Sequence, residues 1–415
     1  MELIIKLPTI QVVSETQTKV SVPYIVENES KELWYLIESK YTSYLTADVA
    51  DAYVVGFLLY AMERNLNIKS EIPLSERLYF QLTKYLMPFL VSFNKHLHVI
   101  NISANLVSKD YEAIHVGTGI SCGVDSLSTI VYHGLEEKVE KNKIDTLTLL
   151  NTGYYGCAEN NSENYRRYIQ QSFDFAEKHH YNFLTVDSNL SNVMEYNFLS
   201  AHTYLTCSVL LLLQKYFSVY YYASGYTVNH FRVDFSDSAN YDIFLLDCIS
   251  TENLKFYSSC CVINRIGKIR MIAQYKDIFE SLYVCTRGIV FNNCSHCEKC
   301  VRTMLALDSM KMIEELKQRF NYSIFKKYRN RYLNYMLRHK GNNPYYKEAF
   351  DCYKKNKIKI PFLAYFSIMP CTFERREMLR SFMNSTLGRW IRKKSFYRKF
   401  VSRIERIFKN YSRRN

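Results

Sequence analysis

The chain has 415 residues, of which 48% are hydrophobic and 23% charged, a composition that excludes disorder as its main state. No apolar run reaches the roughly 18–20 residues that a membrane-spanning helix needs. The N-terminus also lacks the basic start, apolar stretch and cleavage site of a signal peptide. We therefore expect a cytoplasmic protein without a transmembrane segment.

The formal net charge of +14 is unevenly distributed. Residues 1–310 contain 26 Lys and Arg against 33 Asp and Glu, whereas residues 311–415 contain 28 against 7. The net charge is therefore −7 in the first part and +21 in the second. A basic C-terminal region on a mildly acidic body favours a phosphate-bearing partner, which could be RNA, DNA or an anionic membrane.

Residues 1–108 are predicted to form a small N-terminal α/β accessory unit. The apolar periodicity of residues 48–62 indicates a helix, with Thr46 as its N-cap. A second helix should begin at Ser75 and end or bend at Pro88. Two β-type runs come first, at residues 3–6 and 19–22.

Residues 109–310 alternate between strand, loop and helix. Strands are expected at residues 113–118, 146–150, 183–186 and 219–223, and helices at 126–140, at 162–179 and from Ala201. This alternation predicts an α/β fold with a doubly wound parallel sheet. Its ligand site should lie at the carboxyl ends of the strands.

The first of these strands leads into Gly117-Thr-Gly-Ile-Ser-Cys-Gly-Val-Asp-Ser126. Gly123 allows close backbone approach, while Ser121 and Ser126 can donate to phosphate oxygens and Asp125 can hold Mg²⁺. The segment is neither a Walker A loop nor a GxGxxG fingerprint. A plain strand–helix turn with an ordinary Ser or Asp cap is the alternative interpretation.

Four cysteines are spaced Cys285-x8-Cys294-x2-Cys297-x2-Cys300. Two successive Cys-x-x-Cys steps let a tight turn direct three thiolates to one ion, and tetrahedral zinc is the natural occupant. The cluster leads into a predicted helix at residues 298–319. An iron–sulfur cluster and four unliganded core cysteines are the other interpretations.

Ser121-Cys-Gly-Val-Asp-Ser126 resembles the Ser-Gly-Gly-x-Asp-Ser signature of the PP-loop ATP pyrophosphatase superfamily, with Cys122 in place of a glycine. Together with the cysteine cluster some 160 residues later, it is similar to the 7-cyano-7-deazaguanine synthase family over roughly residues 110–310. The resemblance implies an adenine nucleotide alpha hydrolase-like, Rossmann-like domain with a structural zinc knuckle. It also implies ATP-dependent adenylylation of a substrate oxygen, which nitrogen or another nucleophile then replaces.

On this resemblance, Asp125 and Ser126 would be catalytic. Lys268 could reach the phosphates, as could Arg265, although a solvated helix face would explain both. The segments Asn151-Thr-Gly153 and Ser224-Gly225-Tyr226 follow later strands and are weaker candidates for nucleotide or substrate contacts. The implied nucleotide-binding residues are Ser121, Cys122, Gly123, Val124, Asp125, Ser126 and Lys268. Gly153-Tyr-Tyr-Gly departs from the family's second-strand segment, which indicates a different acceptor.

Residues 311–415 are predicted to be helical and basic. Apolar residues recur at roughly helical spacing between residues 378 and 411, with Arg and Lys between them. This arm could pack on the body, bind nucleic acid or lie on an anionic membrane.

The main hypothesis is an ATP-dependent PP-loop ligase that uses Mg²⁺ and contains Zn²⁺, acting on an unidentified small-molecule or nucleic-acid acceptor. The alternative is a non-catalytic nucleotide-sensing or nucleic-acid-binding module whose working surface is the basic arm.

Overall fold

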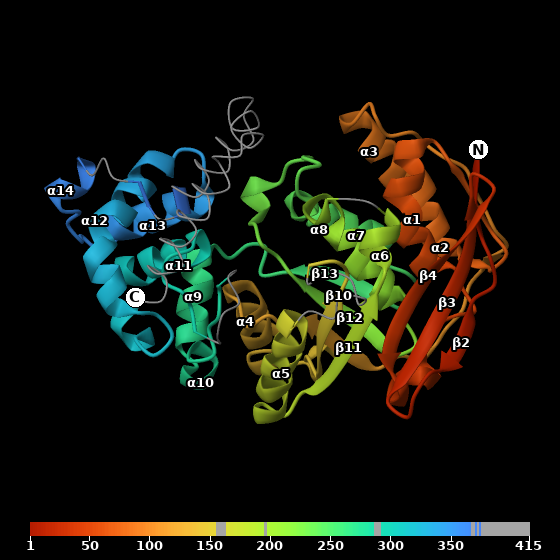
Figure 1. Ribbon diagram of the computed structural model, residues 1–415, viewed down its shortest axis with the longest axis horizontal. Coiled ribbons are helices and arrows are strands. Elements are labelled where there is room, and N and C mark those ends of the chain that lie inside the picture. The colour runs from red at the N-terminus through yellow and green to blue at the C-terminus, as the bar shows by residue number, and fades with distance from the viewer. Residues whose placement is uncertain (155–162, 195–196, 286–291, 367–369, 372, 375–415) are drawn as a thin grey trace, which may run out of the picture. The chain divides into compact units, whose positions relative to one another are not determined.

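The structure is a computed structural model that describes residues 1–154, 163–194, 197–285, 292–366, 370–371 and 373–374 (Figure 1). They belong to two compact units, Met1–Val284 and a second that begins at Cys285. The predicted basic helix within 376–415 lies outside the described residues. None of the helices in these ranges is both long and apolar enough to cross a membrane.

The first unit is built on an eleven-stranded mixed sheet in which most neighbouring strands are parallel. The strand order is β13-β12-β9-β10-β11-β4-β3-β1-β5-β7, and β2 pairs with the early part of β3. The strands are β1 (Glu2–Ile5), β2 (Thr9–Val12), β3 (Gln17–Val26), β4 (Glu29–Glu38), β5 (Asn67–Ser70), β7 (Ile102–Ser103), β9 (His115–Gly119), β10 (Thr146–Asn151), β11 (Asn182–Ser188), β12 (Phe217–Ala223) and β13 (Lys255–Ser259). Two short strands, β6 (Leu74–Ser75) and β8 (Leu106–Val107), pair separately.

The parallel part of the sheet comprises β9 to β13. The chain starts at the central strand β9, moves outward through β10 and β11, and then returns to the other side of β9 to form β12 and β13. After β9 the chain continues to β10 on one side of the sheet, and after β12 it continues to β13 on the other side. In open α/β sheets, ligands bind outside the carboxyl ends of two such strands.

Helices cover both faces of this parallel part, with α4 and α5 on one side and α6 and α7 on the other (Figure 1). Tyr221 of β12 stacks on His133, which follows α4, at 3.6 Å between ring centroids. The next residue, Tyr222, instead contacts His202 of α7, because neighbouring strand residues point to opposite faces.

The helices of this unit are α1 (Asp51–Arg64), α2 (Glu76–Gln81), α3 (Met87–Phe93), α4 (Val124–Ile130), α5 (Glu163–Lys178), α6 (Leu190–Met194), α7 (Phe198–Leu211), α8 (Asp242–Ile249), α9 (Arg265–Ala273) and α10 (Lys276–Phe279).

The strands of residues 1–108 continue the same sheet, because β4 pairs antiparallel with β11. The packing of α1 on α7 strengthens this connection. Ser208 of α7 donates to the carbonyl of Ala52 at 2.7 Å, and its hydroxyl lies 2.9 Å from the Tyr35 hydroxyl. The first compact unit therefore includes both the predicted accessory unit and the predicted nucleotide-binding strands.

The N-cap prediction in this region was wrong, and of the two outcomes predicted at Pro88, an end or a bend of the helix, the structure excludes the end. The N-cap position of α1 is held by Ala50 and not by Thr46, and Ala50 makes no side-chain cap; the Asp51 carboxylate in the first turn accepts hydrogen bonds from Ser75 and Gln214. Pro88 does not end its helix. A π-helical turn over Leu82–Leu86 precedes it and shifts the hydrogen bonding by one residue, so that the helix continues as α3.

The second unit is helical in the described residues, with α11 (Glu298–Ser309), α12 (Tyr322–His339), α13 (Pro344–Lys355) and α14 (Phe362–Tyr365). Its buried core includes Leu305, Leu333, Met336 and Tyr346. The predicted long helix after the cysteines ends at Ser309 and is followed by a 3-10 turn, Ile313–Leu316.

Candidate functional site

The predicted phosphate loop, residues 121–126, lies between the central strand β9 and helix α4. It therefore occupies the carboxyl end of β9, beside the end of β12, where an open α/β sheet binds its ligand. Helix α4 continues into a π-helical segment, Val131–Leu135, so the loop opens a helical stretch of twelve residues. The amides of its first turn have no partners within the helix and favour an anion.

The tight turn of the loop is made at Cys122, which has a left-handed backbone with φ 54°. This is the position at which the PP-loop signature has glycine, and a non-glycine residue there is strained. Gly123 is extended, with φ −77° and ψ 169°. The Tyr283 amide donates to the Cys122 carbonyl at 2.8 Å and holds the turn in place.

The two predicted serines face each other across the loop, with 3.2 Å between their hydroxyl oxygens. Ser121 Oγ accepts from the Gly123 amide at 3.3 Å, and Ser126 Oγ donates to the Gly123 carbonyl at 3.2 Å. Ser121 is exposed, whereas Ser126 and the side chain of Val124 are buried. Ser121 and the loop amides are thus the groups that an incoming phosphate meets first.

Asp125 brings the predicted basic residues into the same site. Lys268 Nζ lies 3.0 Å from Asp125 Oδ1, and Arg265 Nη1 lies 3.5 Å from Oδ2. Lys268 also donates to the carbonyl of Ser224 at 2.6 Å, directly after β12. The Lys268 and Arg265 side chains are only 3% and 5% exposed, so they do not form the solvated helix face that was the other interpretation.

The charges at this site suit an anionic ligand. Two buried cations face the single carboxylate of Asp125, which leaves an excess positive charge beside hydroxyls and helix amides. A phosphate group therefore fits the residues well. Mg²⁺ fits less directly, because both Asp125 oxygens already contact cations, and a magnesium ion would need phosphate oxygens for most of its ligands.

Asp242, at the start of α8, is a further buried acid behind this site. Oδ1 accepts from Ser258 at 3.0 Å, whereas Oδ2 has no hydrogen-bond partner among the described residues. Burial raises the pKa of this carboxyl to about 7, against the opposing effects of the Ser258 hydrogen bond and of the positive charge of Lys268. Asp242 therefore changes charge near neutral pH.

The predicted segment after β10 is adjacent to β11 in the structure. Asn151 Nδ2 donates to Asp187 Oδ1 at 2.8 Å, and Gly153 has φ +121°. A Cβ at Gly153 would lie 2.5 Å from the Ser191 side chain, so the glycine is required by the backbone and by packing. A role for this segment in ligand binding stays a prediction.

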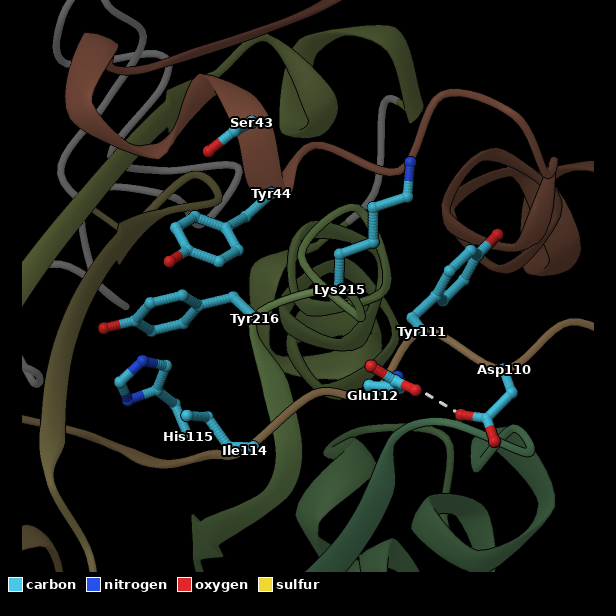
Figure 2. A pocket seen from close by; sticks show the side chains of 9 residues that line it. All are labelled: Ser43, Tyr44, Asp110, Tyr111, Glu112, Ile114, His115, Lys215 and Tyr216. Carbon is cyan, nitrogen blue, oxygen red and sulfur yellow. Dashed lines mark hydrogen bonds between the residues drawn. The ribbon is translucent and has the colours of Figure 1, made fainter.

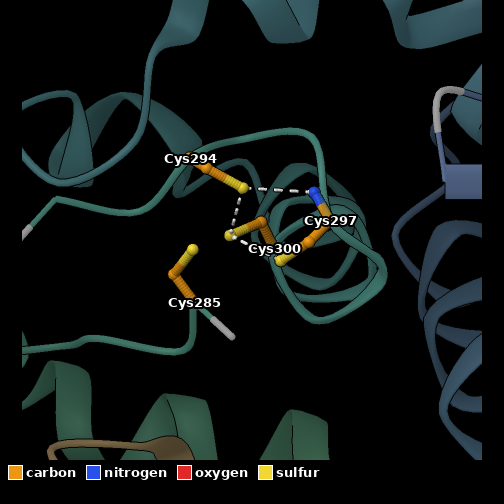
Figure 3. A group of neighbouring side chains, drawn as sticks. All are labelled: Cys285, Cys294, Cys297 and Cys300. Atoms are coloured by element: carbon orange, nitrogen blue, oxygen red, sulfur yellow. Dashed lines mark hydrogen bonds between the residues drawn. The ribbon is translucent and has the colours of Figure 1, made fainter. Parts of the chain in front are cut away.

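The four predicted metal ligands form one cluster in the second unit (Figure 3). Their sulfur atoms all lie within 4.8 Å of one another, with 3.9 Å between those of Cys294 and Cys300 and 3.4 Å between those of Cys297 and Cys300. Four thiolates around a tetrahedral zinc ion at about 2.3 Å lie roughly 3.8 Å apart. The cluster can therefore hold a zinc ion.

The cysteine knuckle is fixed to helix α12. Ser295, between the cysteines, has a left-handed backbone with φ 57° and accepts a hydrogen bond from Tyr332 at its carbonyl. Its hydroxyl accepts from the Asn321 amide at 2.8 Å, and Asn321 is the N-cap of α12. The neighbouring Cys285, Cys294 and Cys297 thiols raise the pKa of Cys300, whereas a bound cation would favour its thiolate.

A separate cavity of about 560 Å³ opens at the other end of the parallel strands (Figure 2). His115 begins β9 there and stacks on Tyr216 at 4.0 Å between ring centroids. Lys215 and Tyr111 line the cavity across from these rings. The cavity is thus distinct from the phosphate loop, and none of the predicted site residues line it.

Sequence reasoning missed three contributors to the loop site. The Ser224 segment was a candidate, but its carbonyl oxygen as the partner of Lys268 was not foreseen. The Tyr283 amide and the Asp242 carboxylate were not identified either. A main-chain acceptor or donor has no residue signature, and the only signal for Asp242 is an acid opening the apolar helix Asp242–Ile249.

No family model, curated protein or solved structure matches this chain.

Proposed function

We propose that the protein binds Mg·ATP at the 121–126 loop and transfers the adenylyl group to an oxygen of an acceptor, in the manner of PP-loop ATP pyrophosphatases. The acceptor oxygen, from a carboxylate or amide, attacks the α-phosphorus of ATP, and pyrophosphate leaves. Nitrogen or another nucleophile then displaces the activated oxygen from the acceptor, and AMP leaves carrying that oxygen.

The observation that carries this proposal is the position of Lys268. Its ammonium group joins Asp125, after β9, to the Ser224 carbonyl, after β12, at the carboxyl ends of the two strands from which the chain diverges. A buried cation at this point, with Arg265 beside it, supports binding of a polyphosphate. The hydroxyl-bearing loop supplies the remaining donors.

Each residue then has a defined role. The Ser121 hydroxyl, which accepts from the Gly123 amide, donates to a phosphate oxygen, while Ser126 keeps the loop closed through the Gly123 carbonyl. Lys268 and Arg265 stabilise the negative charge that develops on the leaving pyrophosphate. Asp125 orients both cations and can contribute one ligand to the Mg²⁺ that accompanies ATP.

The cysteine cluster has a structural role in this proposal. All four ligand positions of a tetrahedral zinc ion are filled by thiolates, which leaves no open position for substrate. Zinc would join Cys285 and the Cys294–Cys297 turn to Cys300 in the first turn of α11, while the Ser295 contacts hold the same turn against α12. Iron–sulfur occupancy is the competing possibility, and metal analysis distinguishes the two.

Product analysis tests the reaction. The zinc-loaded protein is incubated with ATP labelled at the α-phosphate, Mg²⁺, ammonia and pooled carboxylate acceptors, with Lys268→Met as the control. The proposal predicts acceptor-dependent AMP and pyrophosphate from the wild type only. ADP and phosphate would indicate a different phosphoryl transfer. Tight ATP binding without turnover on any acceptor would favour the nucleotide-sensing module.

A further inference from the structure

The first half of α12 presents a basic surface in the second unit. The whole helix, Tyr322–His339, contains no Asp or Glu. At 3.6 residues per turn, Lys326, Lys327 and Arg331 fall on one side of the helix, together with Ser323 and Asn330. The opposite side packs into the core of the unit. We refer to residues 322–331 on this outward side as the α12 surface.

Tyrosine rings flank these cations on both sides. Lys326 Nζ lies 4.4 Å from the centre of the Tyr322 ring. On the other flank, the Tyr328 ring has Lys327 at 5.4 Å and Arg331 at 5.2 Å from its centre. Both rings are partly exposed. The α12 surface thus combines ammonium and guanidinium groups with aromatic faces, arranged side by side along one helix.

The cysteine knuckle extends this surface. His296, which lies between Cys294 and Cys297, places its ring 5.9 Å from that of Tyr328. The knuckle is held against the start of α12 by the Ser295 contacts described above. Metal binding at the cysteines would therefore fix one edge of the α12 surface.

Lys326 and Lys327 of the α12 surface have no carboxylate partner of the kind that two arginines of the same helix have among the described residues. Arg329, on another side of the helix, pairs with Asp308, and Arg338, two turns beyond Arg331, pairs with Glu374. Both lysines are exposed. In the described part of this unit, residues 292–374, there are 16 Lys and Arg against 7 Asp and Glu. The surface is thus complementary to a polyanion.

We propose that the α12 surface binds single-stranded nucleic acid, with Lys326, Lys327 and Arg331 on the phosphates and the rings of Tyr322 and Tyr328 stacking against bases. Cations that follow a backbone beside aromatic faces are the features by which proteins hold unpaired strands. Ser323 and Asn330 add hydrogen-bonding groups on the same side.

A lipid surface fits the same residues poorly. An interfacial helix inserts an apolar face between its cations and the membrane core. In α12 the apolar residues Phe325, Tyr332 and Leu333 are buried within the unit, and Ile324, which is partly exposed, is the one aliphatic residue of 322–331. The surface therefore offers charge, hydrogen bonds and rings to a partner, with little apolar area for insertion.

The test measures binding of fluorescein-labelled 20-nucleotide RNA and DNA strands of mixed sequence by fluorescence anisotropy, with the full chain loaded with zinc. The variant Lys326→Gln/Lys327→Gln/Arg331→Gln removes three charges from the α12 surface. The matched control, Lys354→Gln/Lys355→Gln/Lys357→Gln, removes three exposed charges at the end of α13. Both variants carry the same unmodified C-terminal arm.

We expect the α12 variant to bind at least tenfold more weakly than the control, with the slope of log K against log salt reduced by about 2. Tyr322→Ala should weaken binding about tenfold at unchanged salt slope, because stacking is lost and charge is kept. Equal weakening by the two triple variants would overturn the proposal in favour of diffuse attraction. Absence of strand binding by the wild type, or binding only to vesicles containing phosphatidylserine, would also overturn it.

Discussion

Lys268 and Asp125 are 143 residues apart in the sequence, yet 3.0 Å separates the ammonium nitrogen of the lysine from Oδ1 of the aspartate. The pair joins α9, which follows β13, to α4, which follows β9. A buried ammonium group is costly without a partner, and here it has a carboxylate and the Ser224 carbonyl. The contact therefore holds the candidate nucleotide site together as well as charging it.

Lys268 has two roles in this account: it stabilises the fold of the site and it supplies positive charge for ATP. Comparing Lys268→Met with the double variant Lys268→Met/Asp125→Asn should separate them. The single variant leaves a partly buried carboxylate with one fewer cation, and we expect a loss of about 2 kcal/mol in the free energy of unfolding. The double variant should regain only part of this stability, because it removes the carboxylate that lost Lys268 but also the carboxylate that the buried Arg265 contacts. Both variants should bind Mg·ATP at least tenfold more weakly than the wild type. Restored ATP affinity in the double variant would contradict the role of Lys268 as a phosphate ligand.

The left-handed backbone of Cys122 predicts an order of substitutions at this position. Cys122→Gly relieves strain and should keep the melting temperature within a few degrees, whereas Cys122→Val places a β-branched side chain at φ 54° and should cost about 1–2 kcal/mol. Gly123→Ala is the matched control. Its φ is negative, and the nearest atom to its new Cβ is Ser121 Oγ at 3.3 Å. Thermal unfolding of the three variants checks the order, and equal stability of the valine and glycine variants would be inconsistent with the strained turn.

Asp242 should make the stability of the first unit depend on pH. Its pKa in the folded protein is about 7, above the ordinary aspartate value of 3.8, so the folded state binds the proton more tightly than the unfolded state. The stabilising effect is fully present below about pH 4 and is lost as the pH rises through 7, with a slope of up to about 1.4 kcal/mol per pH unit. Asp242→Asn should therefore gain stability relative to the wild type between pH 5 and pH 8. Urea unfolding of both proteins at pH 5 and at pH 8 measures this gain. If the difference in unfolding free energy between variant and wild type is the same at both pH values, Asp242 does not titrate in this range.

Metal analysis tests the cysteine cluster. We expect one zinc per chain in the purified protein and almost none in Cys294→Ser/Cys297→Ser, since two of the four ligands are then missing. Chelation of the wild type should lower the melting temperature of the second unit. Cys352→Ser, which alters another buried cysteine of the same unit, should keep its zinc. Iron with visible absorption, or equal metal loss from Cys352→Ser, would argue against a zinc knuckle.

The sequence predicted the parts of this molecule that depend on local pattern. The alternation of apolar runs located β9 to β12, and small hydroxyl residues at a strand–helix junction located the loop. The pairing of β4 with β11 was not foreseen, because it joins segments about 150 residues apart and depends on sheet edges that no local pattern marks. Strand β13 was also missed, since Lys-Phe-Tyr-Ser-Ser carries a weak β signal. The loop motif indicated the turn but not that Cys122 would take the left-handed backbone.

Calorimetry of Mg·ATP binding tests the central claim most directly. It compares the wild type with Gly123→Val, after elemental analysis has shown equal zinc in both samples. The valine lies at an ordinary negative φ but adds bulk where phosphate meets the loop amides. The account predicts saturable binding to the wild type and loss of binding in the variant at unchanged melting temperature. Absence of binding to the zinc-loaded wild type, or equal binding to both proteins, would contradict a nucleotide site at this loop.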